Sequence, residues 1–213
     1  MYLVELNKLI EDGENSTVEF KRKFSTPEKI AKEMIAFANT KGGHILFGVD
    51  DDRKVIGVDS EKEELELITT AAKFYCEPEI DFDSEILCLR NKDVVIVNVE
   101  ESKKKPVRLI SSNGDSDKIV YIRYKDKCVI ASKETIGILK NSNVDSSPLQ
   151  ITLGDIEKSL LKYLGENEKI TTKEFKKLVN ISERRASRTL INLVRAEVIR
   201  HHRSDKQEYF TLT

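Results

Sequence analysis

The feature of this sequence that most constrains its fold is a polar stretch, "NSNVDSSPLQ", at residues 141–150. The stretch is rich in Ser and Asn, contains a Pro and shows no hydrophobic periodicity, which is the usual composition of a linker. A chain of 213 residues is long enough for one core of about 100–150 residues and a smaller module. We therefore expect two domains, over residues 1–143 and 150–213.

The part of the chain before the linker mixes helical and strand-like patterns. Apolar spacing predicts a helix that Gly13 closes, a second that Thr26 caps and Gly42-Gly43 ends, and a third over roughly residues 63–74. Alternation predicts strands at residues 17–23, on both sides of an acidic turn at residues 50–52, and at 80–89, 94–99 and 119–126. We expect an α+β domain, a mixed sheet-and-helix fold in which most strands are antiparallel.

The part after the linker has a different pattern of apolar residues. Helical spacing recurs over residues 156–164, in "TTKEFKKLV" and in "SERRASRTLINLVRAEVI", and the tail "IRHHRSDKQEYFTL" reads as two short strands around a turn. Three helices and a β-hairpin in about 60 residues indicate a small winged helix-turn-helix domain.

The charges of the two parts differ in sign. The whole chain holds 36 Lys and Arg against 37 Asp and Glu, so any attraction to nucleic acid must come from local segregation of charge. Residues 151–213 hold 13 basic and 9 acidic residues, a net charge of +4, which leaves 23 and 28, or −5, for residues 1–150.

Basic side chains gather on two elements of the second part. Arg184, Arg185 and Arg188 lie near the start of its third helix, where Arg184 and Arg188 share the face opposite the core. That face is where a recognition helix meets a major groove. In the hairpin, Arg200, Arg203 and Lys206 could contact phosphates or a minor groove. The alternatives are that these arginines serve solubility, or that the helices bind another protein.

Four segments of the first part, taken together, resemble the AlbA-like domain of the Schlafen family over about residues 14–137. They are "GENSTVEFK", "IAFANTKGGHILFGVDDDRKVIGV", "KPV" at residues 105–107 and "VYIRYKDKCVIAS". In animal Schlafens two such lobes form a horseshoe that cleaves transfer or ribosomal RNA with two glutamates and an aspartate. The resemblance carries those three onto Glu14, Glu19 and Asp52, and a following basic residue onto Lys21. Because only one lobe is present here, it also implies a homodimer.

The chemistry of these carboxylates suits a divalent cation. Three converging carboxylates can hold Mg²⁺ or Mn²⁺, and Lys21 could neutralise the charge that develops during phosphoryl chemistry. Glu14 and Glu19 are five residues apart, so they have opposite parity on a strand and converge only if Glu14 lies in the preceding loop. The alternative is that acidic residues at a turn are ordinary solvated turn formers.

Other sites are less well supported by the sequence. Arg123, on a predicted strand, is equally suited to a phosphate and to a carboxylate on a neighbouring strand. Zinc is not expected, because Cys76, Cys88 and Cys128 are scattered and fit buried, reduced thiols. ATP is not expected either, since Gly42-Gly43 lacks the G-x-x-x-x-G-K-[ST] spacing that cradles phosphates.

Two functions remain open. The first is a DNA-binding regulator of transcription, the arrangement that microbial relatives with an appended winged helix suggest. The second is a metal-dependent endoribonuclease acting on transfer or ribosomal RNA through Glu14, Glu19 and Asp52. The chain has no run of 18 apolar residues and no signal-peptide cleavage site, so we expect a soluble, cytoplasmic protein without a membrane partner.

Overall fold

The computed structural model describes residues 1–110, 119–142 and 153–213. These residues form two compact units, Met1–Ala131 and Ser132–Thr213. The division differs from the predicted boundary at residue 143, because helix α4 (Lys133–Asn141) packs against α7 (Glu183–Arg195) in the second unit. Most of the predicted linker, from residue 143 to residue 150, lies outside the described residues.

The first unit is built on a four-stranded sheet in the order β1-β2-β5-β4. Its strands are β1 (Val18–Lys21), β2 (Gly43–Phe47), β4 (Phe82–Leu89) and β5 (Lys92–Val99). β1 pairs with β2 in parallel, and the other two pairings are antiparallel. The expected α+β class with a mostly antiparallel sheet is confirmed.

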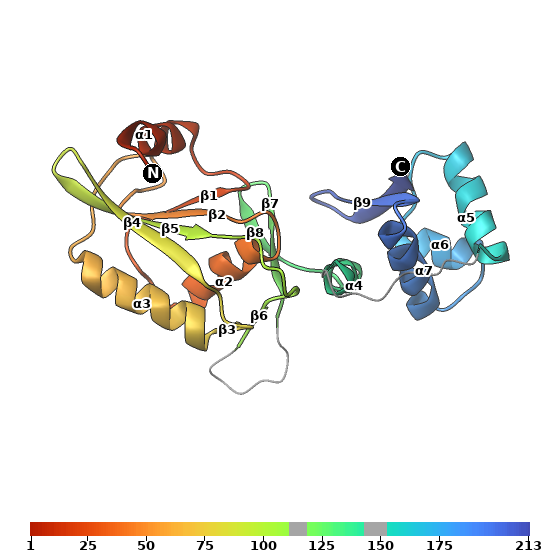
Figure 1. Ribbon diagram of the computed structural model, residues 1–213. Helices are drawn as coiled ribbons and strands as arrows, with labels where there is room; N and C mark the ends of the chain where they lie inside the picture. The colour runs from red at the N-terminus through yellow and green to blue at the C-terminus, as the bar shows by residue number, and fades with distance from the viewer. Residues whose placement is uncertain (111–118, 143–152) are drawn as a thin grey trace. The chain divides into compact units, whose positions relative to one another are not determined.

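Helices cover both faces of this sheet. Figure 1 shows α1 (Leu3–Asp12) on one face and α2 (Pro27–Ala38) with α3 (Glu61–Phe74) on the other. Successive side chains of a strand point to opposite faces, and β2 shows it: Ile45 and Phe47 join the core beneath α2 and α3, whereas Leu46 joins the core beneath α1. Every β2 position from residue 45 to residue 47 is therefore buried.

Two further strand pairs extend the first unit. β3 (Cys76–Glu77) pairs with β6 (Arg108–Leu109), and β7 (Tyr121–Tyr124) pairs with β8 (Lys127–Ile130) in a hairpin that packs along α2. Asn39, the residue after α2, ties them together: its side-chain amide donates to the carbonyls of Val107 and Tyr121, both at 2.9 Å. This buried amide replaces backbone pairing where the segments meet.

Three local predictions need correction. Helix α2 ends at Ala38 with Asn39 as its C-cap, so Gly42-Gly43 does not end it, although the Gly42 amide bonds the Phe37 carbonyl at 3.0 Å. The hairpin expected around residues 50–52 is reduced to one bridge between Val49 and Val55. Of the three cysteines expected to be buried, Cys76 is buried, Cys128 is half-buried and Cys88, near the end of β4, is exposed.

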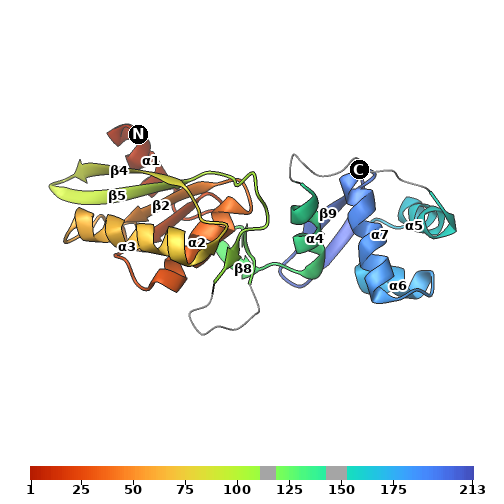
Figure 2. The same ribbon diagram turned by 60° about the horizontal axis from the view of Figure 1, so that its bottom comes forward.

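The second unit contains four helices and a two-stranded sheet among its described residues. They are α4, α5 (Asp155–Glu166), α6 (Thr172–Leu178), α7, β9 (Ile199–Arg203) and β10 (Glu208–Leu212), all visible in the second view (Figure 2). An antiparallel bridge from Ile170 to Phe210 adds a third short strand segment beside β10. Leu160, Phe175 and Leu190 from the three later helices meet Phe210 in one core.

Every described helix is too short or too polar to cross a membrane.

Gly43 gives a test of the packing between β1, β2 and α2. A Cβ at this position would lie 2.5 Å from the Thr17 carbonyl oxygen and 2.6 Å from the Phe37 ring. Because a backbone carbonyl cannot move aside, we expect Gly43→Ala to lower the free energy of unfolding by about 1–3 kcal/mol, the usual cost of overpacking. Gly165→Ala in α5 is the control, since no atom lies within 4 Å of its added methyl. Equal stability of both variants, by calorimetry, would contradict this.

Candidate functional site

Glu19 lies at the centre of a buried charge cluster. It belongs to β1, pairs in register with Ile45, and faces the side of the sheet that α2 covers, so only 8% of the residue is exposed. One oxygen forms an ion pair with Lys21, and the other accepts a hydrogen bond from Arg123 Nη1 at 2.8 Å. The sequence expectation of a half-buried strand with Glu19 on a polar face is therefore wrong.

Arg123 binds carboxylates, the second of the two roles left open by the sequence. Its side chain is 1% exposed, and Nη1 also donates to Glu33 at 3.1 Å. Nη2 donates to the Asn15 carbonyl at 2.8 Å, and the guanidinium lies 4.7 Å from the centre of the Phe37 ring. These contacts join β1, α2, β7 and the loop before β1, and they enclose the charge away from solvent.

Glu33 on α2 completes the cluster with an unfavourable charge. Burial, and then the nearby Glu19 carboxylate, raise the pKa of Glu33 above its ordinary value, although Lys21 and Arg123 oppose the shift. Two carboxylates thus share one guanidinium, and the charge of Glu19 makes Glu33 harder to ionise.

Glu14 lies in the loop between α1 and β1, the location that convergence with Glu19 requires. Its Oε1 accepts a hydrogen bond from the backbone amide of Phe20 at 2.8 Å. Burial raises the pKa of Glu14, and the charges of Glu19 and Asp51 raise it further, whereas the Phe20 hydrogen bond and the charge of Lys21 oppose the shift. Glu14, Glu19 and Asp51 are therefore close enough to interact electrostatically.

The predicted third carboxylate, Asp52, has an open environment. Its side chain is 80% exposed and approaches Lys54 at 3.9 Å. Asp50 organises the same turn, since its Oδ1 accepts from the amides of Asp52 and Lys54 at 3.0 and 3.1 Å. Of the acids in this turn, Asp51 is the one whose charge raises the pKa of Glu14.

The fit of this site to a divalent cation is incomplete in the described conformation. Nowhere in residues 1–110, 119–142 and 153–213 do three or more His, Cys, Asp or Glu side chains form a group arranged to hold a metal ion. Both oxygens of Glu19 are engaged by cationic side chains. Glu14 and the acids of the turn, Asp51 and Asp52, are donors that a cation could recruit without removing Arg123 from Glu19.

The basic residues predicted on α7 are exposed. Ser182 caps the helix by accepting from the Arg185 amide at 3.3 Å, and the buried face holds Ala186, Thr189, Leu190 and Leu193. Arg184 and Arg188 point away from that face. All three arginines, with Arg200 and Lys206 of the hairpin, are exposed to solvent.

Arg203, the other basic residue predicted to contact nucleic acid, is attached to Glu208 on the facing strand. Arg203 Nη1 donates to Glu208 Oε1 at 3.0 Å, and His201 Nε2 lies 3.1 Å from Oε2. Burial would raise the pKa of Glu208, but hydrogen bonds from His201 and Ser132 and the charge of Arg203 outweigh it and lower the pKa. Glu208 therefore stays ionised and pairs with part of the hairpin's basic charge.

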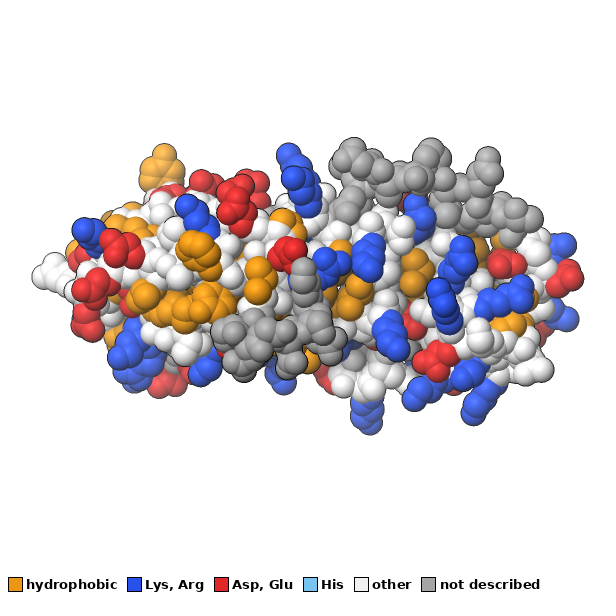
Figure 3. All heavy atoms as spheres, turned by 90° about the horizontal axis from the view of Figure 1, so that it is seen from below, with side chains coloured by type: hydrophobic (Ala, Val, Ile, Leu, Met, Phe, Trp, Pro, Cys, Tyr) orange, Lys and Arg blue, Asp and Glu red, His pale blue; other side chains and the backbone are white. Residues whose placement is uncertain are grey.

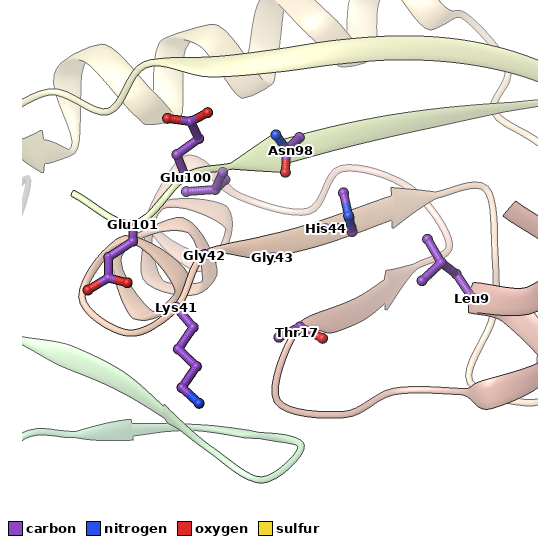
Figure 4. A pocket seen from close by; sticks show the side chains of 10 residues that line it. Leu9, Thr17, Lys41, Gly42, Gly43, His44, Asn98, Glu100 and Glu101 are labelled. Carbon is purple, nitrogen blue, oxygen red and sulfur yellow. The ribbon is translucent and has the colours of Figure 1, made fainter. Parts of the chain in front are cut away.

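A hollow of about 520 Å³ opens where β2 begins (Figure 4). His44 and Asn98 line it from paired positions on β2 and β5, beside Gly42 and Lys41. Burial lowers the pKa of His44, and no described residue hydrogen-bonds its Nδ1. A neutral imidazole in this position can offer one donor or one acceptor to a polar group.

The sequence analysis missed two acidic residues that belong to this site. Glu33 is an acid between Ile30 and Phe37 on the core side of α2, and that interruption of an apolar face was the signal for a buried partner. Asp51 lies beside Asp52 in a run of three acids, so spacing alone does not distinguish them.

Comparison with known proteins identifies the first unit. The sequence profile described as "Schlafen, AlbA_2" matches residues 14–132, which is more than half of the chain and ends where the first compact unit ends. The chain therefore belongs to the Schlafen AlbA_2 family.

One curated relative is the uncharacterized ATP-binding protein UU034 of Ureaplasma parvum, 33% identical over 142 residues, with 56% of this chain and 40% of the relative covered. The chain thus spans less than half of that relative's length.

Two solved structures are similar. The DIP2311 protein of Corynebacterium diphtheriae matches with a TM-score of 0.50 and 15% identity, over 77% of this chain and 33% of that one, which shows a shared fold. The N-terminal domain of a putative ATP-dependent DNA helicase RecG-related protein of Nitrosomonas europaea matches with a TM-score of 0.43 and 19% identity, over 72% of this chain and 92% of that domain.

Removing Arg123 tests whether the cluster holds the first unit together. Breaking a buried ion pair by deleting one partner leaves uncompensated charge and costs about 3–5 kcal/mol, so Arg123→Met is expected to lower the free energy of unfolding by that amount. Lys54→Met is the control, because its pair with Asp52 is 74% and 80% exposed and such pairs contribute about 0–1 kcal/mol. Denaturant unfolding measures both. A loss below 1 kcal/mol in Arg123→Met would show that the cluster is dispensable.

Proposed function

We propose that this protein binds nucleic acid, and that its second unit is a winged helix that binds duplex DNA through α7. The observation that carries the proposal is the exposure of Arg184, Arg185 and Arg188 on α7, on the side away from its buried residues. In a winged helix the second helix of the helix-turn-helix enters the major groove. Here α6 and α7 would form that motif, and β9 with β10 would form the wing.

The distribution of charge supports this proposal. Figure 3 shows Lys and Arg side chains gathered over the face of the second unit that is turned to the viewer, with few acidic side chains among them. Residues 151–213 carry a net charge of +4 although the whole chain is close to neutral. A polyanion would therefore be attracted mainly by this part of the chain. A regulator of transcription is the kind of protein we propose.

A second candidate is a divalent-metal-dependent endoribonuclease that acts on transfer or ribosomal RNA in the first unit. The observation in its favour is the electrostatic contact of Glu14 with Glu19 and Asp51. We propose that Mg²⁺ or Mn²⁺ would be held by these carboxylates and would polarise a phosphate. Lys21, beside Glu19, would neutralise developing charge, and Asp52 remains an alternative third ligand.

Two further points belong to the proposal. A homodimer is the expected assembly, because a single lobe cannot surround a duplex-sized substrate.

ATP is not a ligand in this proposal, although the Ureaplasma relative is named as ATP-binding, because the sequence lacks the G-x-x-x-x-G-K-[ST] spacing that cradles phosphates.

The DNA proposal predicts a specific loss of affinity. Arg184→Ala with Arg188→Ala should weaken duplex binding by about 1–3 kcal/mol for each base contact and flatten the dependence of log K on log salt by about 0.9 for each phosphate contact. Fluorescence anisotropy across a salt series measures both quantities. Arg22→Ala with Lys23→Ala removes two exposed charges from the first unit and should change neither. Unchanged affinity and slope in the α7 variant would exclude α7 from DNA binding.

The metal proposal predicts a stabilisation that depends on particular carboxylates. Mn²⁺ at about 100 times its dissociation constant should stabilise the wild type by about 2.7 kcal/mol, seen as a higher melting temperature. Glu14→Gln keeps the acceptor for the Phe20 amide but should abolish the shift. Asp51→Asn and Asp52→Asn form a matched pair that decides which turn residue is a ligand. If the site cleaves RNA, Mn²⁺-dependent cleavage should fall by orders of magnitude in the same variants, because one catalytic unit fails together. A Mn²⁺ shift retained in Glu14→Gln would refute the site.

A further inference from the structure

Helix α4 lies on the side of α7 that is proposed to meet DNA. Ile191 is seven residues after Arg184 and three after Arg188, so the three side chains share one face of α7. Gly137 in the middle of α4 packs against Ile191: a Cβ at residue 137 would lie 3.2 Å from Ile191 Cγ1 and would collide with Cδ1. A glycine inside a helix costs about 1 kcal/mol relative to alanine, and here it permits the close approach.

The contact extends along both helices. Lys133, Glu134 and Asn141 of α4 line a groove of about 570 Å³ together with α7 side chains that include Arg184 and Arg188. The two arginines stay exposed at the rim of this groove. What α4 covers is the space in front of them, which a DNA edge would have to enter.

The start of α4 is attached to the hairpin and to α6. Ser132 Oγ donates to Glu208 Oε2 at 2.5 Å, and Thr135 Oγ1 donates to Glu208 Oε1 at 3.3 Å. Thr172 Oγ1, at the start of α6, donates to Glu134 at 3.3 Å. α4 is therefore fixed to all three parts of the proposed DNA-binding surface: α6, α7 and the wing.

The dimensions of DNA show what the position of α4 against α7 implies for binding. The major groove is about 12 Å wide, and one α-helix with its side chains has a diameter of about 10–12 Å. The groove therefore accepts α7 alone, and α7 with α4 on its outer face cannot enter. We propose that α4 is an autoinhibitory helix, and that duplex DNA binds only when α4 leaves α7. This inference rests on the proposed DNA binding.

The docked helix is suited to release. α4 has nine residues, and an isolated helix shorter than about 12–15 residues is marginal in water. Only Thr135 and Leu139 of α4 are fully buried. Glu208 keeps its contacts with Arg203 and His201 when Ser132 and Thr135 depart, so release leaves no buried carboxylate without a partner.

A disulfide between α4 and α7 tests the proposal directly in the full chain. The Cβ of residue 191 is bonded to the Cγ1 that lies 3.2 Å from the Cβ position at residue 137, which places Gly137→Cys and Ile191→Cys near the Cβ separation of about 3.5–4.5 Å that a disulfide requires. The exposed Cys88 is replaced by Ser in this variant. Burial raises the pKa of Cys76 and Cys128 to about 12, so these two thiols stay protonated and unreactive.

The oxidised and reduced forms of this one variant are then compared by anisotropy with a mixed-sequence DNA duplex at low salt. We expect the oxidised form to lose binding and dithiothreitol to restore it, because only reduction lets α4 leave. Equal affinity of the two forms would overturn the inference while the proposed function stands. If the wild type and the reduced variant both fail to bind duplex DNA, the proposed function is wrong and this inference falls with it.

A second variant tests release without a crosslink. Gly137→Leu favours the helical state of α4 but cannot fit against Ile191, so it separates docking from helix formation. If the undocked form is about a tenth of the wild-type population, the DNA affinity of Gly137→Leu should be roughly tenfold higher than that of the wild type. Gly165→Leu in α5 is the matched control, because its added side chain starts in open space, and its affinity should equal that of the wild type. An unchanged affinity in Gly137→Leu would count against α4 as an inhibitor.

Discussion

The first unit depends on one buried guanidinium. Arg123 comes from a hairpin late in the unit, yet it binds a carboxylate on β1, a carboxylate on α2 and the backbone of the loop before β1. A buried charge of this kind is tolerated only when its partners are all in place. The position of Glu19, and through the Phe20 amide that of Glu14, therefore follows from how well the β7–β8 hairpin is docked on α2.

This arrangement changes how the acidic residues of the Schlafen AlbA_2 domain should be understood. Carboxylates gathered near one point repel each other and resist ionisation unless a cation is present. Arg123 and Lys21 supply that positive charge to Glu19 from within the chain. Burial raises the pKa of Glu14, and the charge of Lys21 offsets that shift only in part. A bound divalent ion would relieve that cost, so the proposed metal site would be centred on Glu14 and the adjacent turn.

Much of the secondary structure was predictable from the sequence, because it follows from local periodicity and capping. Helix α1 ends at Gly13, α2 begins after Thr26, and the alternation over residues 82–99 gives β4 and β5. The environment of Glu19 was not predictable, since it depends on Arg123, which is 104 residues away in the chain. The same applies to α4, a helix that the sequence analysis did not predict: only its tertiary contacts assign it to the second unit.

In both units, clustered charges are paired with oppositely charged groups of the same chain. In the first unit a guanidinium and a lysine bind Glu19. In the second, Glu208 binds Arg203 and His201, and side chains of α4, among them Glu134, line a groove together with Arg184 and Arg188. Like charges held on one surface repel one another and disfavour folding, and in water dissolved salt reduces this repulsion. A ligand of opposite charge must therefore exceed an intramolecular competitor to bind. Under the proposed function, affinity for nucleic acid would be set by the difference between two attractions, so a contact that never touches the ligand, such as that of Gly137 with Ile191, would control it.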